Sequence, residues 1–275
     1  KSLSEYLKEN NIIGIEGIDT RYLTRHIRLQ GAMKAVISTE IHDNKSLLKI
    51  LNPSPGLVGV DLVKEVSFNK VWHWNNSGKY KVVVIDCGTK FNILRELAKR
   101  DCKVIVVPAN MSSGKILAMK PDGVLLSNGP GDPAAVRYVI QTTRELIGKV
   151  PIFGICLGQQ ILGLAFGGKT YKLKFGHHGA NHPVKDLRSG RVYITTQNHG
   201  FCVDIKTLNK KEIEITHVNL NDNTLEGMRH KKLPIFSVQF HPESSAGPHD
   251  ATYLFDEFIA MIKNSHQVTT SPGHT

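Results

Sequence analysis

Between residues 81 and 166 the sequence alternates short apolar runs with helix-forming segments, and this alternation restricts the fold more than any other feature. The first run, KVVVID at residues 81–86, is continuously apolar, as expected for a strand buried on both faces of a parallel sheet. Alternation of strands and helices predicts an α/β fold, a doubly wound and mostly parallel sheet. The other predicted strands are 103–107, 123–126 and 151–155, and the predicted helices are 91–99, 115–119, 134–147 and 157–166.

The rest of the chain divides into less regular parts. A domain over residues 80–265 is expected to continue through β patterns at 192–196 and 235–240 to an amphipathic helix at 250–263, with a flexible tail at 266–275. Residues 66–79 are polar with two tryptophans, which indicates a linker that packs on a domain surface. Residues 1–65 read as the remainder of a small α/β N-terminal domain. Its expected elements are a helix at 2–10, a strand or tight loop at 12–18, a helix from Asp19 or Thr20 to about Leu29, and a strand at 33–38.

Composition excludes several classes of protein. The formal charge is +11, but the basic residues are scattered and carry no nucleic-acid-binding signature, so a basic face for an acidic partner protein or for anionic metabolites is the better interpretation. No apolar run approaches the roughly 20 residues that a membrane helix needs, and no signal peptide is evident. The four cysteines form no C-x-x-C pair, which argues against a disulfide framework or a zinc site and favours a reducing compartment, the cytoplasm or a plastid.

One cysteine stands in a distinctive setting. Gly154-Ile155-Cys156-Leu157-Gly158 lies between a predicted strand and a predicted helix, and glycines flank the thiol on both sides. Small neighbours permit the sharp turn of a nucleophile elbow, which lifts the side chain clear of the sheet. The start of the following helix would favour the thiolate and would direct N–H groups at a bound carbonyl. The alternative is a buried cysteine in an ordinary turn.

A second motif, His241-Pro242-Glu243, follows the apolar strand at 235–240. Residues i and i+2 of an extended segment point the same way, so the carboxylate can orient the imidazole. Alone this motif is equally compatible with a surface loop. Together with the elbow it predicts a thiol hydrolase with Cys156, His241 and Glu243 as its triad. The turn at 127–133, SNGPGDP, also follows a strand, and strand carboxyl ends line the site in such sheets.

Other polar residues receive structural interpretations. His177, His178 and His182 have no helix to align them and no carboxylate or thiolate nearby in the sequence, so they are expected in a surface loop near the site or a partner interface, and no metal site is predicted. Cys87 lacks the glycine pair of the elbow and is expected in the core, as are Cys102 and Cys202. Asp86 and Lys90 are expected to be structural.

Four motifs taken together, SNGPGDP, GICLGQQ, QNHGF and VQFHPE, resemble the class I, or triad-type, glutamine amidotransferases. Two further stretches, residues 14–37 and 174–186, resemble the small subunit of carbamoyl-phosphate synthetase, and residues 243–258 agree. The resemblance extends from about Ser2 to Lys263. By position it implies that Cys156 is the nucleophile, His241 the general base and acid, and Glu243 the orienting carboxylate. It also implies that L-glutamine contacts Gly129, Gly131, Leu157, Gln160, Asn198, Gly200 and Phe201.

Two departures from the family pattern stand out. Gln159 occupies a position where the family usually has histidine, outside the triad. The first part of the family's N-terminal domain, with one serine of the glutamine site, is not found before Lys1.

The implied activity is hydrolysis of glutamine to glutamate and ammonia through a γ-glutamyl thioester. The chain has no P-loop, so we expect no cofactor here and expect ATP and Mg²⁺ on a large synthetase partner that forms carbamoyl phosphate for arginine and pyrimidine synthesis. Two alternatives stay open: a glutaminase of an anthranilate- or GMP-type synthetase, which the N-terminal stretch disfavours, and a non-catalytic relic used as a scaffold, which the intact triad disfavours.

Overall fold

The computed structural model describes residues 1–270, with side chains described to residue 267. The chain forms two compact units, residues 1–57 and residues 58–275. The expected boundary after residue 65 therefore differs from the observed division. Residues 58–65 pack with the second unit, where Val63 is fully buried and the N–H of Gly59 donates to Asp132 Oδ2 at 2.8 Å.

The first unit consists of short capped helices. A capping box formed by Ser2 and Glu5 begins α1, and the carboxylates of Asp19 and Asp43 cap α2 and α3. The expected strand at 33–38 is wrong, because no segment of this unit pairs with it. Residues 12–18, expected as a strand or a tight loop, form a loop. None of the three helices has a buried residue, so this unit has no hydrophobic core of its own. The helices are α1 (Leu3–Glu9), α2 (Thr20–Gln30) and α3 (Asn44–Leu51), and the sequence pattern does not predict α3.

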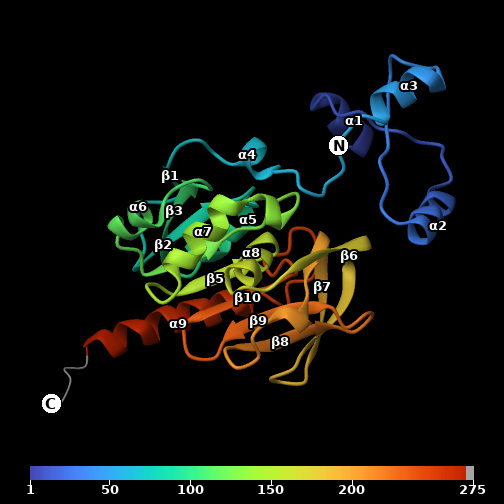
Figure 1. Ribbon diagram of the computed structural model, residues 1–275. Helices are drawn as coiled ribbons and strands as arrows, with labels where there is room; N and C mark the ends of the chain where they lie inside the picture. Colours follow the sequence, from blue (N-terminus) through green and yellow to red (C-terminus); the bar gives the residue numbers. More distant parts are fainter. Residues whose placement is uncertain (271–275) are drawn as a thin grey trace. The chain divides into compact units, whose positions relative to one another are not determined.

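The second unit is built on one ten-stranded sheet (Figure 1). Its central five strands are parallel, in the order β3-β2-β4-β5-β10, and the remaining pairs are antiparallel. The doubly wound α/β prediction is confirmed, and the sheet is mixed. In spatial order the strands are β1 (Trp72–His73), β3 (Cys102–Pro108), β2 (Tyr80–Asp86), β4 (Gly123–Leu126), β5 (Ile152–Ile155), β10 (Ile235–Val238), β9 (Leu225–His230), β8 (Ile213–Asn219), β6 (Thr170–Asp186) and β7 (Val192–Val203).

Helices cover both faces of the parallel part. Alternate residues of β2 enter two separate cores: Val83 and Ile85 join one, and Val82 and Val84 join the other. The first core is covered by α6 (Ser113–Ala118), α7 (Arg137–Leu146) and α8 (Leu157–Ala165), and the second by α5 (Phe91–Ala98) and α9 (Tyr253–Thr270). Two short 3-10 helices, η1 (Pro133–Ala135) and η2 (Ile205–Thr207), and the helix α4 (Val63–Val66) complete the unit.

The expected linker and tail contribute more structure than predicted. Within residues 66–79, β1 pairs antiparallel with β3, and the Trp72 ring packs against Phe68 and Trp74. The last helix, predicted to end at Lys263, continues to Thr270, and residues 271–275 of the expected tail lie outside the described residues. Among the helices that the structure describes, none has the length and apolarity to cross a membrane.

Candidate active site

Cys156 occupies a strained turn between β5 and α8. Its backbone lies at φ 54° and ψ −102°, outside the regions that a side-chain-bearing residue favours, and its N–H donates to Val238 O of β10 at 2.9 Å. A Cβ at Gly158 would lie 2.2 Å from Leu126 O, and one at Gly154 would lie 2.8 Å from the Gly158 carbonyl. Both flanking positions therefore require glycine, as the sequence motif predicts. The turn has the geometry of a nucleophile elbow.

His241 and Glu243 meet beside this turn. His241 Nδ1 lies 2.7 Å from Glu243 Oε1, which leaves Nε2 for the thiol, and Cys156 interacts directly with the imidazole. All three side chains are buried, with exposed fractions of 2% for Cys156, 6% for His241 and 0% for Glu243. The backbone N–H of His241 donates to Thr196 O of β7 at 2.9 Å, which fixes the segment after β10. The structure thus brings together the three residues that the sequence predicts as a triad.

Lys90 and Asn92, at the start of α5, hold Glu243 in place. Lys90 Nζ lies 2.9 Å from Glu243 Oε1 and donates to Ser244 O at 2.7 Å, while Asn92 Nδ2 donates to the Glu243 carbonyl. The interpretation of Lys90 as merely structural is incomplete, because its charge reaches the triad. More than 150 residues separate it from Glu243, so no local pattern indicates the contact. Asp86 has the expected structural role, since its carboxylate accepts from Gly88, Thr89 and Phe68.

The electrostatics favour a charged imidazole. Burial opposes a charge on His241, but its interactions with Cys156 and the Glu243 carboxylate outweigh this effect and raise the pKa of His241 to about 10. Burial likewise opposes a charge on Glu243, but His241 and Lys90 together lower the pKa of Glu243. An imidazolium between a thiolate and a carboxylate is the arrangement that activates a cysteine nucleophile.

Several of the residues expected to contact glutamine lie around the elbow. Leu157 and Gln160 belong to the first turns of α8, and Gln160 Nε2 donates to Phe201 O at 2.7 Å. Asn198 O lies 4.0 Å from Cys156 Sγ. A Cβ at Gly129 would lie 2.7 Å from the Leu157 side chain, so that turn also reaches the elbow. Asn198, Gly200 and Phe201 lie in β7 rather than in a loop, and Gly131 takes φ +89° beside Leu62.

The remaining sequence interpretations have mixed outcomes. Gln159 is fully buried, and its amide contacts Leu225 O and Ser237, both at 3.4 Å, on the β9 and β10 side of α8. Cys87, Cys102 and Cys202 are free and buried, and burial raises the pKa of each thiol. The surface-loop prediction for the histidine stretch is wrong: His177, His178 and His182 lie in β6, and His177 is buried. Carboxylates that are distant in sequence, Asp222 and Glu226, lie against His177.

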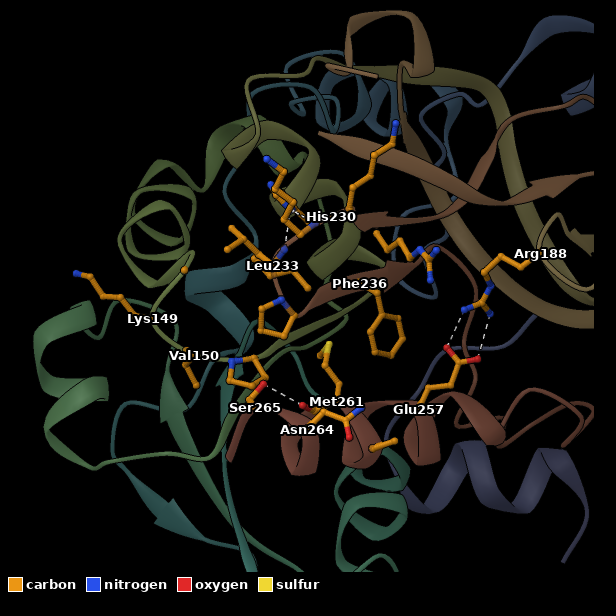
Figure 2. Close-up of a pocket in the computed structure, with 18 residues that line it drawn as sticks. Lys149, Val150, Arg188, His230, Leu233, Phe236, Glu257, Met261, Asn264 and Ser265 are labelled. Atoms are coloured by element: carbon orange, nitrogen blue, oxygen red, sulfur yellow. Dashed lines mark hydrogen bonds and ion pairs between the residues drawn. The ribbon is translucent and has the colours of Figure 1, made fainter. Parts of the chain in front are cut away.

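A separate cleft of about 810 Å³ lies at the opposite ends of the strands, beside the starts of β5 and β10 and the second half of α9 (Figure 2). Phe236 and Met261 form part of its floor, and the Arg188–Glu257 ion pair lies at one side. None of the residues predicted for catalysis or glutamine binding lines this cleft. The carboxyl ends of the strands, where the triad lies, remain the candidate site.

Comparison with known proteins agrees with this geometry. The family model "Glutamine amidotransferase class-I" matches residues 83–261, and the model for the carbamoyl-phosphate synthase small chain, CPSase domain, matches residues 1–37. The crystal structure of a protein assigned as a GMP synthase subunit from Thermoplasma acidophilum has the same fold, with a TM-score of 0.62 over 70% of this chain and 98% of that one, at 22% identity. The protein is therefore an enzyme subunit of the class I glutamine amidotransferase type.

Relatives with more similar sequences identify the family to which the chain belongs. The carbamoyl phosphate synthase small chain of Aquifex aeolicus is 54% identical over 96% of this chain and 74% of its own length. The small chain of Syntrophotalea carbinolica is 50% identical over 97% and 74%, and the chloroplastic small chain of Oryza sativa is 47% identical over 96% and 62%. The chain belongs to the carbamoyl phosphate synthase small-chain family.

The raised pKa of His241 gives a test of the thiol–imidazole pair. In the parent protein we expect the His241 imidazole, followed by NMR, to stay protonated until about pH 10. Replacing Cys156 by serine removes the thiolate, so the pKa should fall by more than one unit while Glu243 remains. By linkage, the stabilisation from a raised histidine pKa is complete below its unfolded value, near 6.5, and is lost as the pH rises towards 10. An unchanged titration in the variant would contradict a direct thiol–imidazole pair.

Proposed function

We propose that the chain hydrolyses L-glutamine at Cys156 and delivers the ammonia to a large synthetase subunit that makes carbamoyl phosphate. The observation that supports this most strongly is the buried series Cys156, His241 and Glu243 at an elbow whose glycines admit no other residue. Membership of the small-chain family supports the identity of the partner and of the product. The nitrogen would then serve arginine and pyrimidine synthesis.

The proposed reaction begins with attack of the Cys156 thiolate on the side-chain carbonyl of glutamine. The N–H groups of Leu157 and Gly131 stabilise the oxyanion, and the Leu157 N–H has no acceptor within α8 because it stands at the first position of the helix. His241 gives its proton to the leaving ammonia. The departure of ammonia leaves a γ-glutamyl thioester on Cys156. The same imidazole then takes a proton from the water that attacks the thioester. This attack releases glutamate and restores the Cys156 thiolate.

The binding pocket for glutamine is proposed from positions rather than from a bound ligand. Gly129 and Gly131 let the backbone of one turn approach the substrate, and Asn198, Gly200 and Phe201 supply the edge of β7 on the other side. Gln160 joins α8 to β7 through its hydrogen bond to Phe201 O. The chain itself needs no cofactor for this chemistry, and ATP and Mg²⁺ would act on the partner subunit.

A glutaminase assay with and without the synthetase subunit tests the proposal. Hydrolysis without a consumer wastes the amide nitrogen, so we expect a low rate for the isolated chain and a rise of about 100-fold in the complex. Such a rise corresponds to about 2.7 kcal/mol of differential binding between the inactive and competent arrangements of the site.

The competing explanation for activation is rescue of an unstable chain by its partner. Circular dichroism of the lone chain, recorded alongside rates over a series of partner concentrations, separates the two explanations. A well-folded lone chain that turns over as fast as the complex would exclude gating. Absence of glutamate release from both the lone chain and the complex would favour the scaffold alternative.

A further inference from the structure

Two histidines and a glutamate lie close together in the antiparallel half of the sheet, which includes β7, the strand beside the elbow. His177 comes from β6, His199 from β7 and Glu226 from β9, and their exposed fractions are 5%, 6% and 0%. One nitrogen or oxygen of each lies within 4.8 Å of the other two. Three strands therefore direct potential ligand atoms at one buried point.

The outer nitrogen of each imidazole lies within hydrogen-bond distance of an oxygen. His177 Nε2 lies 2.8 Å from Asp222 Oδ2, which places its proton on Nε2. His199 Nδ1 lies 2.8 Å from Phe201 O and Nε2 lies 3.0 Å from Gln197 Oε1, two oxygens that only accept, so either ring nitrogen can carry the proton. With the proton on the outer nitrogen, each ring turns a lone pair towards the centre of the cluster. Histidines that bind metals are oriented in this way by outer carboxylates and carbonyls.

The inner atoms are only partly paired. Within the described residues His177 Nδ1 has no hydrogen-bond partner, and it stands 3.6 Å from Glu226 Oε1. His199 Nε2 faces Gln197 Oε1 at 3.0 Å. That amide is held in place because Gln197 Nε2 donates to Glu226 Oε2 at 2.8 Å. The other Glu226 oxygen, Oε1, accepts from Asn219 Nδ2 at 2.9 Å. Asp222 and Glu226 favour a positive charge at this buried point, which either a proton on His177 or a bound cation would supply.

We propose that His177 Nδ1, His199 Nε2 and Glu226 form a binding site for a divalent transition-metal ion of the zinc type. Neutral imidazole and carboxylate are ligands that Zn²⁺ prefers, and Gln197 Oε1 or a water can fill the fourth position. Tetrahedral coordination at 2.0–2.1 Å places ligand atoms roughly 3.3 Å apart, so groups that now lie within 4.8 Å of one another must close by up to about 1.5 Å. The pairing of β6 with β7 is irregular on both sides of His177, which gives this strand room to adjust.

The ion would act on the structure rather than on the reaction. All three protein ligands are buried, and His199 lies in β7 between Asn198 and Gly200. The Phe201 carbonyl that orients His199 also accepts from Gln160 of α8. A bound ion would therefore fix the β7 segment beside the elbow.

Metal binding is measured directly in a Cys156→Ser background, because the Cys156 thiol and His241 could otherwise bind zinc themselves. The purified full chain is stripped with a chelator and dialysed against Zn²⁺ or Co²⁺. We expect one equivalent of metal by mass spectrometry, the visible bands of tetrahedral Co²⁺ without a thiolate charge-transfer band, and a higher melting temperature with metal. His177→Gln and Glu226→Gln should each weaken binding by at least tenfold.

Two further variants separate coordination from a general folding defect. Asp222 is partly exposed, and Asp222→Asn keeps its shape but weakens the hydrogen bond that orients His177, so affinity should fall about 10- to 100-fold. The neighbouring His178 is exposed and faces the other side of β6, so His178→Gln should bind metal as the parent does. Circular dichroism confirms folding of each variant. The proposal is overturned if the folded chain takes up no stoichiometric metal, as expected if a proton on His177 holds the cluster together. It is equally overturned if folded His177→Gln and Glu226→Gln bind as tightly as the parent.

Discussion

Replacing Cys156 by serine is expected to reduce glutamine hydrolysis by at least about 10³-fold. The elbow would remain, because serine is smaller than cysteine and the strained backbone is set by Gly154 and Gly158. The lost component is the thiolate, since His241 is arranged to stabilise a charged sulfur and a serine hydroxyl remains protonated beside it. Glutamate release by the complex is the measurement.

Synthesis of carbamoyl phosphate from added ammonia distinguishes loss of the nucleophile from loss of the complex. We expect that rate to survive in Cys156→Ser, because the ammonia-consuming chemistry would lie on the partner. Cys102→Ser is the matched control, since this thiol is buried in β3 away from the elbow and should leave glutaminase activity intact. Near-parental glutaminase activity in Cys156→Ser would exclude Cys156 as the nucleophile.

The second large effect is expected at His241. His241→Asn removes the only group in the triad that can both accept and return a proton, and kcat/KM should fall by about 10³-fold or more. Glu243→Gln should cost less, because the glutamine amide still accepts a hydrogen bond from His241 Nδ1 and only the negative charge is lost. We therefore expect the histidine variant to be clearly slower than the glutamate variant when both are assayed in the complex.

Both variants alter a buried ionic cluster, so folding must be checked before rates are compared. Glu243→Gln leaves Lys90 without its carboxylate partner, and Lys90→Met in the same chain restores the balance of charge. If the double variant is as stable as the parent and still slow, the loss belongs to catalysis. Equal or reversed losses in the two folded single variants would contradict the assigned roles of His241 and Glu243.

The sequence predicts the parallel half of the sheet closely, because local patterns determine it. The strand at residues 123–126 and the helix beginning at Leu157 fall where apolar runs and glycines place them. The elbow is predictable for the same reason, since the close approach of Gly158 to Leu126 requires a residue without a side chain.

The antiparallel half could not be predicted from local pattern. The β6 and β7 segments are rich in histidine, asparagine and glycine, which resembles a loop, yet they pair with each other over most of their length. Their polar side chains become buried only because β9 and the Asp222 turn, distant in sequence, supply partners such as Glu226. The contact of Lys90 with the triad escapes local pattern for the same reason. In the N-terminal unit, the apolar residues near Met33 form no strand because no neighbouring strand is present to pair with them.

The spacing between nucleophile and base follows from one feature of the sheet. β5 and β10 are parallel neighbours in which Ile155 stands opposite Val238, so Cys156 begins one residue past that level and His241 three residues past it. Both side chains lie on the short segments that directly follow these strands. Because side chains alternate between the faces of a strand, adding or removing a single residue in β10 would turn its whole apolar pattern over and shift His241 relative to the thiol. A change in the length of one strand alone would therefore displace one catalytic side chain relative to the other, and the hydrogen bonds between β5 and β10 set the spacing between Cys156 and His241.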